Sequence, residues 1–308
     1  MKKVIVSLLL AAVSFSALAQ STEQEYLERY NRLVRNVGNT GVGVETLLNK
    51  WEDAFPEDAN MLAAAFLYYY EKSQTAITVS KNTSTYLGQK SILQLKDSLG
   101  KDVYYFYDTE YDDEVFGKAQ QYIDKVNQKF PLKLENRCAA ITALTNYEKG
   151  SPDMALSRIK ELVAYNYGSK PEWTSEDEAV DNETFKSIVQ EYCYSFFKLA
   201  TPSGYEAFRS ITEDMLKHNA NDALFLDNMG SYYLVGKDDP KTAQKYYDKV
   251  LKLKKDDLTA IKNGVILSRK MKNAKLEKKY LAMLVQYAED EPTKQSSQAR
   301  LDYLNGKK

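Results

Sequence analysis

The fold is decided by the run Leu226-Asp227-Asn228-Met229-Gly230-Ser231-Tyr232-Tyr233 and by a second apolar segment that follows it. In the run, apolar side chains recur three and four residues apart, and in the second segment Ala243 is followed at +4 and +7 by Tyr247 and Val250. This spacing places the side chains on one stripe of an α-helix. Asp239-Pro240 precedes the second segment and supplies a capping side chain and a proline for the first turn. The sequence therefore predicts two consecutive helices, each with one buried face.

The same +4 and +7 stripe recurs along the chain. Six stripes begin at Val44, Ala119, Ala155, Phe208, Ala243 and Tyr280, each twelve residues before an anchor position. Proline occupies three of the anchors, which are positions 56, 131 and 292; the others are 167, 220 and 255. Successive anchors differ by 75, 36, 53, 35 and 37 residues. Three gaps therefore fit one helix-pair repeat, and the other two contain roughly 40 and roughly 20 additional residues.

The repeat resembles the tetratricopeptide repeat (TPR) family, whose unit of about 34 residues carries W-x2-L-G-x2-Y, A-x3-F and a late proline. Here the first element reads Leu226-x2-Met229-Gly230-x2-Tyr233 and the second reads Ala243-x3-Tyr247. The resemblance extends from residue 23 to residue 292. It implies an all-α fold, a right-handed α-solenoid of about six TPR-like helix pairs with a small β-hairpin insertion and a C-terminal capping helix at 293–304. An unrelated helical bundle is the alternative.

The first long gap predicts the insertion, at residues 73–111. Ile92 to Lys96 and Val103 to Tyr107 alternate around Asp97-Ser98-Leu99-Gly100, which is typical of a β-hairpin. Thr75 to Ser80 adds a further strand or extends the preceding helix. The aromatic side chains of the hairpin need a surface to pack on, either the chain's own helices or a partner. The second gap, Gly168 to Glu178, predicts a long loop, and loops of this length are often functional or mobile.

The N-terminus has the pattern of an export signal. Met1-Lys2-Lys3 is followed by an uncharged apolar run from Val4 to Ala19, and the run ends on a small-x-small motif. This pattern predicts a signal peptide at 1–19, cleaved near Ala19, and a solenoid at 20–308. A membrane anchor is the competing interpretation, but spanning needs roughly 20 apolar residues. We therefore expect a periplasmic or secreted protein without a membrane span.

Composition argues against catalysis and against nucleic-acid binding. The chain has 42 Lys and Arg against 43 Asp and Glu, so it lacks a cationic footprint. One histidine, His218, and two cysteines, Cys138 and Cys193, are too few for common metal or triad chemistry. Buried free thiols are expected, with a disulfide left open as the alternative. The acids of Asp108 to Glu114 fit helix capping better than a calcium loop. No enzyme, cofactor or metal is predicted.

The resemblance implies that the first helix of each pair lines a concave face that contacts peptides. The candidate partner-binding residues on this face are Asn60, Leu67, Tyr70, Thr142, Phe197 and Asp227, and the hairpin adds Tyr104 and Phe106. The predicted function is a non-enzymatic protein- or peptide-binding scaffold of the bacterial cell envelope. The alternatives are a glycan-binding accessory protein of a nutrient-uptake system that uses exposed aromatics and, more remotely, a redox role for the two cysteines.

Overall fold

The computed structural model describes the backbone of residues 19–306 and the side chains from residue 23 onward. Most of the predicted signal peptide, residues 1–18, therefore lies outside the described residues. The chain is mostly helical, and it divides into two compact units that meet in sequence between Val189 and Gln190. Within residues 19–306, we find no helix that combines the length and the apolar character needed to cross a bilayer.

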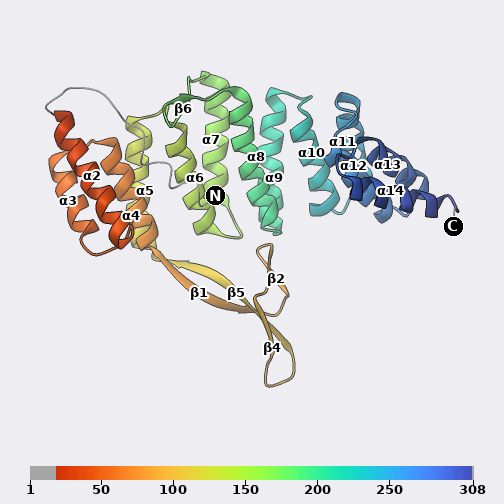
Figure 1. Ribbon diagram of the computed structural model, residues 1–308, viewed down its shortest axis with the longest axis horizontal. Helices are drawn as coiled ribbons and strands as arrows, with labels where there is room; N and C mark the ends of the chain where they lie inside the picture. The colour runs from red at the N-terminus through yellow and green to blue at the C-terminus, as the bar shows by residue number, and fades with distance from the viewer. Residues whose placement is uncertain (1–18, 307–308) are drawn as a thin grey trace. The chain divides into compact units, whose positions relative to one another are not determined.

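Unit 1 contains a row of helices, and each of the first six packs against its neighbour along the chain (Figure 1). Its helices are α2 (Ala19–Val37), α3 (Val44–Ala54), α4 (Ala59–Lys72), α5 (Asp113–Lys129), α6 (Leu134–Glu148), α7 (Asp153–Ser169) and the beginning of α8 (Asn182–Lys198). The predicted pairs are α2 with α3, α4 with α5, and α6 with α7.

Unit 2 continues the same alternation of first and second helices. Its elements are the end of α8, α9 (Pro202–His218), α10 (Ala223–Ser231), α11 (Pro240–Leu253), α12 (Leu258–Lys270), α13 (Ala274–Tyr287) and α14 (Glu291–Leu304). From α9 to α14, each helix packs against the next one along the chain. A π-helical turn, η2 (Tyr232–Gly236), extends α10.

The predicted stripes lie in the second helix of each pair and face the core. They fall in α3, α5, α7, α9, α11 and α13, and every stripe residue is buried except Tyr287, which is half-buried. Each buried aliphatic or aromatic side chain contributes about 1.5–3 kcal/mol relative to exposure. The structure thus confirms the helical periodicity inferred from the sequence.

Two glycines of unit 2 allow tyrosines of the stripe to approach the first helix closely. A Cβ atom on Gly230 of α10 would lie 2.4 Å from Cε1 of Tyr247, and one on Gly264 of α12 would lie 2.5 Å from Cδ1 of Tyr280. Both tyrosine rings are fully buried. A methyl group at either glycine would overlap the ring, so these contacts require glycine.

Ser151-Pro152 and Asp239-Pro240 each place a capping side chain before a proline and so predict a helix start, but only the second start is confirmed. Asp239 caps α11, because its Oδ1 accepts from the Thr242 N–H at 3.0 Å and Pro240 occupies the first turn. By contrast, α7 begins at Asp153 and Ser151 does not cap it. The carboxylate of Glu148 takes that role, since it accepts from the N–H groups of Met154 and Ala155 at 2.6 and 2.8 Å.

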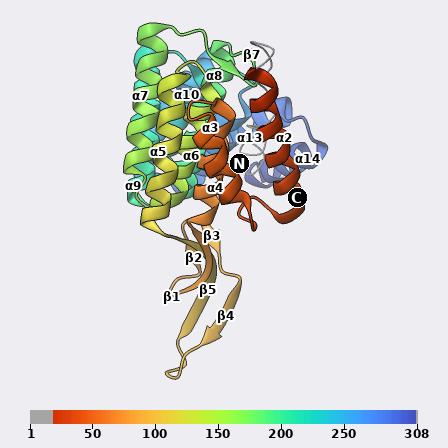
Figure 2. The same ribbon diagram turned by 90° about the vertical axis from the view of Figure 1, so that its left-hand side faces the viewer.

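The insertion between α4 and α5 forms an arm, which we define as residues 74–111. It contains β1 (Gln74–Lys81), β2 (Thr85–Tyr86), β3 (Gln89–Lys90), β4 (Leu93–Lys96) and β5 (Asp102–Tyr111). The antiparallel sheet has the order β1-β5-β4, so it has three strands, and β2 pairs with β3 separately. The arm extends away from the helices of unit 1 in both views (Figures 1 and 2).

The second insertion is a loop held to α7 by a buried tryptophan. It contains β6 (Thr174–Ser175) and β7 (Glu178–Ala179). Trp173 is 2% exposed, and its Nε1 donates to Oδ1 of Asn166 at 2.9 Å. The guanidinium of Arg137 lies 5.5 Å from the indole ring. These contacts anchor the beginning of the loop to the helices.

Candidate functional site

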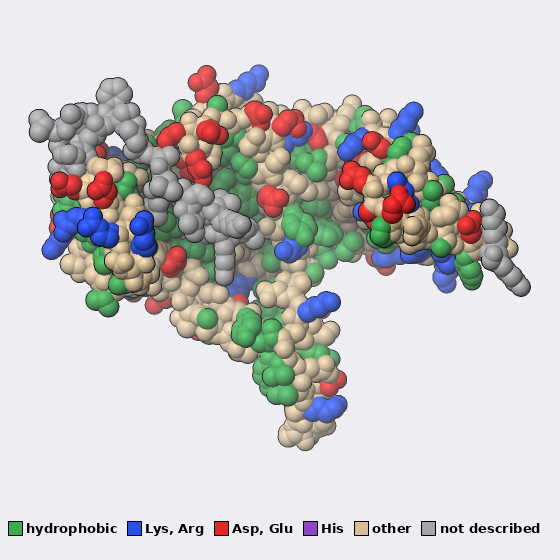
Figure 3. Space-filling model, in the orientation of Figure 1, with side chains coloured by type: hydrophobic (Ala, Val, Ile, Leu, Met, Phe, Trp, Pro, Cys, Tyr) green, Lys and Arg blue, Asp and Glu red, His purple; other side chains and the backbone are tan. Residues whose placement is uncertain are grey.

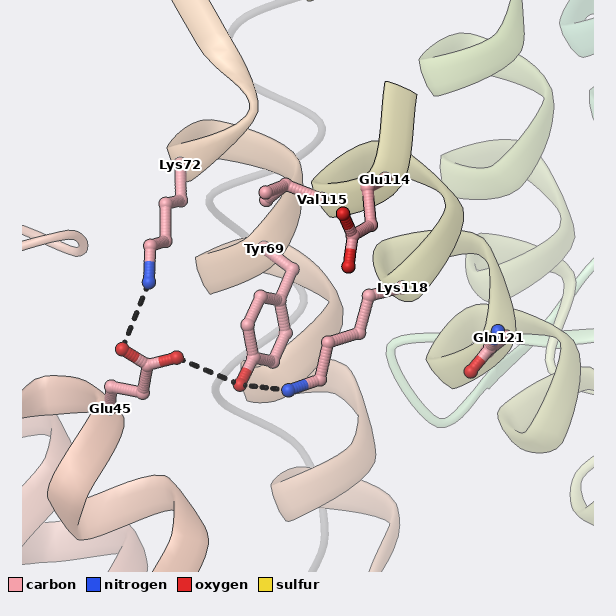
Figure 4. A pocket seen from close by; sticks show the side chains of 7 residues that line it. All are labelled: Glu45, Tyr69, Lys72, Glu114, Val115, Lys118 and Gln121. Carbon is pink, nitrogen blue, oxygen red and sulfur yellow. Dashed lines mark hydrogen bonds and ion pairs between the residues drawn. The ribbon is translucent and has the colours of Figure 1, made fainter. Parts of the chain in front are cut away.

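An open pocket of about 410 Å³ lies where α3, α4 and α5 meet, next to the base of the arm. Figure 4 shows the side chains that line it, which are Glu45, Tyr69, Lys72, Glu114, Val115, Lys118 and Gln121. Most of these side chains are charged or polar, and the two glutamates balance the two lysines. The pocket is therefore suited to a polar ligand without a strong excess of charge.

Local helix geometry explains why these residues converge. On α3 the buried stripe begins at Val44, and Glu45 is the next residue along the helix. Tyr69 and Lys72 are three residues apart on the last turn of α4, so they lie on the same side of that helix. Lys118 and Gln121 have the same spacing on α5. The pocket is thus built from three short helical patches that only packing brings together.

Glu45 accepts the hydrogen bonds that hold one side of the pocket together. Its carboxylate accepts from Nζ of Lys72 at 2.9 Å and from the hydroxyls of Tyr68 and Tyr69, both at 3.1 Å. The hydrogen bond from Lys72, together with those from the two tyrosines, lowers the pKa of Glu45. The same contact with Glu45 raises the pKa of Lys72. Both groups therefore stay ionised over the physiological range.

Tyr69 joins this cluster to α5. Nζ of Lys118 donates to the Tyr69 hydroxyl at 2.6 Å and lies 4.0 Å from the centre of its ring. The Tyr69 ring stacks on Tyr122, with 5.6 Å between centroids and 3° between planes, and the Tyr122 hydroxyl donates to Oε2 of Glu52 at 2.7 Å. Burial, reinforced by the bond to Glu52, raises the pKa of Tyr122. These contacts fix the Tyr69 ring in the pocket.

The two lysines differ in what they contact, and the difference indicates where a ligand would bind. Lys72 is paired with the carboxylate of Glu45, whereas Lys118 contacts the hydroxyl and ring of Tyr69. Lys118 could therefore bind an acidic group of a ligand while the Tyr69 side chain holds its ammonium group in position. The exposed amide of Gln121 lies one turn further along the same helix. Together they can bind a carboxylate or a backbone carbonyl.

Most residues that the sequence nominated for partner binding are buried. Leu67, Tyr70, Phe106, Thr142 and Asp227 are all less than 10% exposed. The Tyr70 hydroxyl accepts from Nδ2 of Asn146 at 2.9 Å, and burial next to Asp257 raises the pKa of Asp227 to about 8. The other three nominated residues, Asn60, Tyr104 and Phe197, are half-buried, and Phe197 packs against Tyr205 and Phe208. None of the eight lines the pocket.

Sequence reasoning missed the pocket and the burial of α4. The signal for burial was present, because Met61 to Tyr70 is an unbroken run of ten apolar or aromatic residues. A helix that is apolar on all sides packs on all sides rather than lining a groove. Glu45, Tyr69 and Lys118 had no comparable signal, since 73 residues separate the first from the last and the arm lies between them.

The aromatic and thiol groups offer little exposed chemistry. Both tryptophans, Trp51 and Trp173, are buried, and the prominently exposed tyrosines among the described residues, Tyr107, Tyr194 and Tyr303, belong to three different elements. These three tyrosines therefore do not form a continuous aromatic surface on one element on which a glycan could stack. Cys138 and Cys193 are both buried and are not joined in a disulfide. Burial raises the pKa of the Cys193 thiol to about 12.

Comparisons with known proteins find a likeness only among solved structures, and it is weak. No family model matches the chain, and no curated protein matches it. One solved structure is titled "Functional Characterization of Pseudomonas Aeruginosa pilF". Its alignment covers 92% of this chain and 99% of the chain in that structure, at 12% sequence identity and a TM-score of 0.36. A likeness at this TM-score establishes neither family nor function.

Proposed function

We propose that the chain is a non-enzymatic scaffold that binds a protein or peptide in the bacterial cell envelope. The observation that carries the proposal is the regular succession of helix pairs, each with its stripe buried in the second helix, because such repeats expose extended surfaces used for binding. The proposal includes a right-handed TPR-like solenoid, with a signal peptide cleaved near Ala19 and export to the periplasm or beyond. Mass spectrometry of the N-terminus of the mature protein tests the cleavage.

Partner contact is proposed along the first helices and at the inserted arm, with the pocket as its polar centre. The pocket supports this placement, because it combines an open cavity with a lysine that a phenol holds in place and lies next to the base of the arm. A peptide carrying an acidic side chain would place its carboxylate against Lys118. The pairing of Glu45 with Lys72 would keep that side of the pocket neutral.

Site-specific photo-crosslinking tests this function. A photoreactive residue replaces Gln121, which lines the pocket, or Gln128, which is exposed two turns further along the same helix. We expect a discrete crosslinked protein from living cells at position 121 and not at 128, and we expect its yield to fall when Lys118→Met removes the charge. Equal crosslinking at both positions, or none at either, would contradict the proposal.

A further inference from the structure

The sheet of the arm separates charged from uncharged residues. Side chains alternate between the two faces of a strand, and residues directly opposite in an antiparallel pair share a face. One face, here called the open face, is formed by the even-numbered positions of β1, the odd-numbered positions of β5 from Val103 to Tyr111, and Leu93 and Leu95 of β4. None of these positions is charged. The charged residues of the three strands, Lys81, Lys96, Asp102, Asp108 and Glu110, all belong to the opposite face.

The face that carries the charges is also the one the chain covers. The ring of Tyr86, at the end of β2, lies 5.6 Å from the ring of Phe106, which is fully buried. The Tyr86 hydroxyl donates to Oδ2 of Asp108 at 3.3 Å, and Nζ of Lys81 lies 4.5 Å from the Tyr86 ring. The β2–β3 hairpin thus gives this face its own small core.

Tyr111, at the base of the arm, packs against Phe116 and Tyr147, but beyond it the open face is exposed to solvent. Tyr107 is 70% exposed, and Leu93 and Leu95 are 49% and 48% exposed. Figure 3 shows hydrophobic side chains gathered along the arm. Sheets that face water on one side normally place charged and polar residues there; this face has polar residues on β1 but no charge. Charged side chains of an occupant would find no opposite charge on this face to offset their burial. The occupant must therefore present an uncharged face of its own.

The shape of the open face is complementary to itself. Tyr105 and Tyr107 form a ridge along β5, and their direct neighbours on β1 are the small residues Ser80 and Thr78. The small residues Thr78 and Ser80 leave a trough along β1. A two-fold axis parallel to the strands and between β1 and β5 would place the ridge of each copy over the trough of the other. We propose that the open face of the arm binds the same face of a second copy of this chain.

The area of the face sets the strength of this association. The proposed axis leaves β4 outside the contact, so only the four positions of β1 and the five of β5 contribute to it, which is less than half of the roughly 20–30 residues per side of a stable interface. We therefore expect a concentration-dependent dimer in the micromolar range. The resulting dimer would carry two copies of the helical binding surface. This inference rests on the sheet register and not on the proposed scaffold function.

Sedimentation equilibrium of the full chain, from low to high micromolar concentration, tests the proposal. Thr78 and Thr75 are both exposed on β1 but belong to opposite faces, so they form a matched pair. Thr78→Lys places a charge in the trough and is expected to weaken dimerisation by more than about tenfold. Thr75→Lys is expected to dimerise like the unsubstituted chain. Equal circular dichroism and thermal unfolding would show that both variants fold.

The arrangement of the two copies has its own test. The proposed axis brings position 78 of one copy next to position 107 of the other, while the native cysteines are buried. A mixture of Thr78→Cys and Tyr107→Cys chains should form disulfide-linked dimers faster than either variant alone under mild oxidation. A chain that remains monomeric at every concentration overturns the proposal, as does a dimer that Thr78→Lys leaves intact. Crosslinking at Gln121 reports separately on the scaffold function.

Discussion

Asp227 provides a sharp test of the packing in unit 2. It lies on α10 with 6% of its surface exposed, and its Oδ1 has no hydrogen-bond partner in the described part of the chain. Burial, with the nearby carboxylate of Asp257 as a second cause, raises the pKa of Asp227 to about 8 from its ordinary 3.8, although Lys254 opposes the shift. Asp257 itself caps α12 by accepting from the N–H groups of Thr259 and Ala260. The substitution Asp227→Asn removes the titrating group while keeping its size.

The shift predicts how the free energy of unfolding depends on pH. Between the unfolded pKa near 3.8 and the folded pKa near 8, the folded chain holds a proton on Asp227 that the unfolded chain releases. The group therefore lowers the stability of the wild-type chain as pH rises through this window. At about 1.36 kcal/mol per pH unit, the effect amounts to about 3 kcal/mol between about pH 5 and about pH 7. Asp227→Asn should remove this dependence.

Urea unfolding of both proteins at the two pH values measures the effect. The advantage of Asp227→Asn over the wild type should grow by about 3 kcal/mol from the lower to the higher pH. Asp290→Asn is the control, because hydrogen bonds with Thr293 lower the pKa of Asp290 below 3.8, so its difference from the wild type should stay constant between the two pH values. If the difference between Asp227→Asn and wild type does not change with pH, the inferred burial of an acid beside Asp257 is wrong.

Two further predictions concern unit 2 and the thiols. Gly230→Ala should destabilise the chain by about 1–3 kcal/mol in urea unfolding, because the new methyl group meets the Tyr247 ring, whereas Gly117→Ala, which meets nothing within 4 Å, should be neutral or slightly stabilising. Equal effects of the two substitutions would contradict the close approach. Cys138 and Cys193 should react with a thiol reagent only on unfolding, because both are buried; rapid labelling of either in the native protein would refute their burial.

The sequence predicted the helices well, whereas it carried no signal for the pocket. Ala243, Tyr247 and Val250 could be placed on one buried stripe because the α-helical period is a local property of the chain. The same period could not distinguish a first helix that lines a groove from one buried on most sides, and Leu67 and Thr142 are buried. Of the candidates on the first helices, only Asn60 and Phe197 are partly exposed, and their part in partner contact stays a prediction.

What the sequence by itself determined is the order of the helices, the position of the arm and the turn at Asp97 to Gly100. All of these depend on residues within one helical turn or one strand pair of each other. Only the tertiary structure decided that Glu45, Tyr69 and Lys118 meet, and that the uncharged face of the arm is the one left open. These features depend on contacts between distant segments and on which face the β2–β3 hairpin covers. Such contacts leave no periodic trace in the chain.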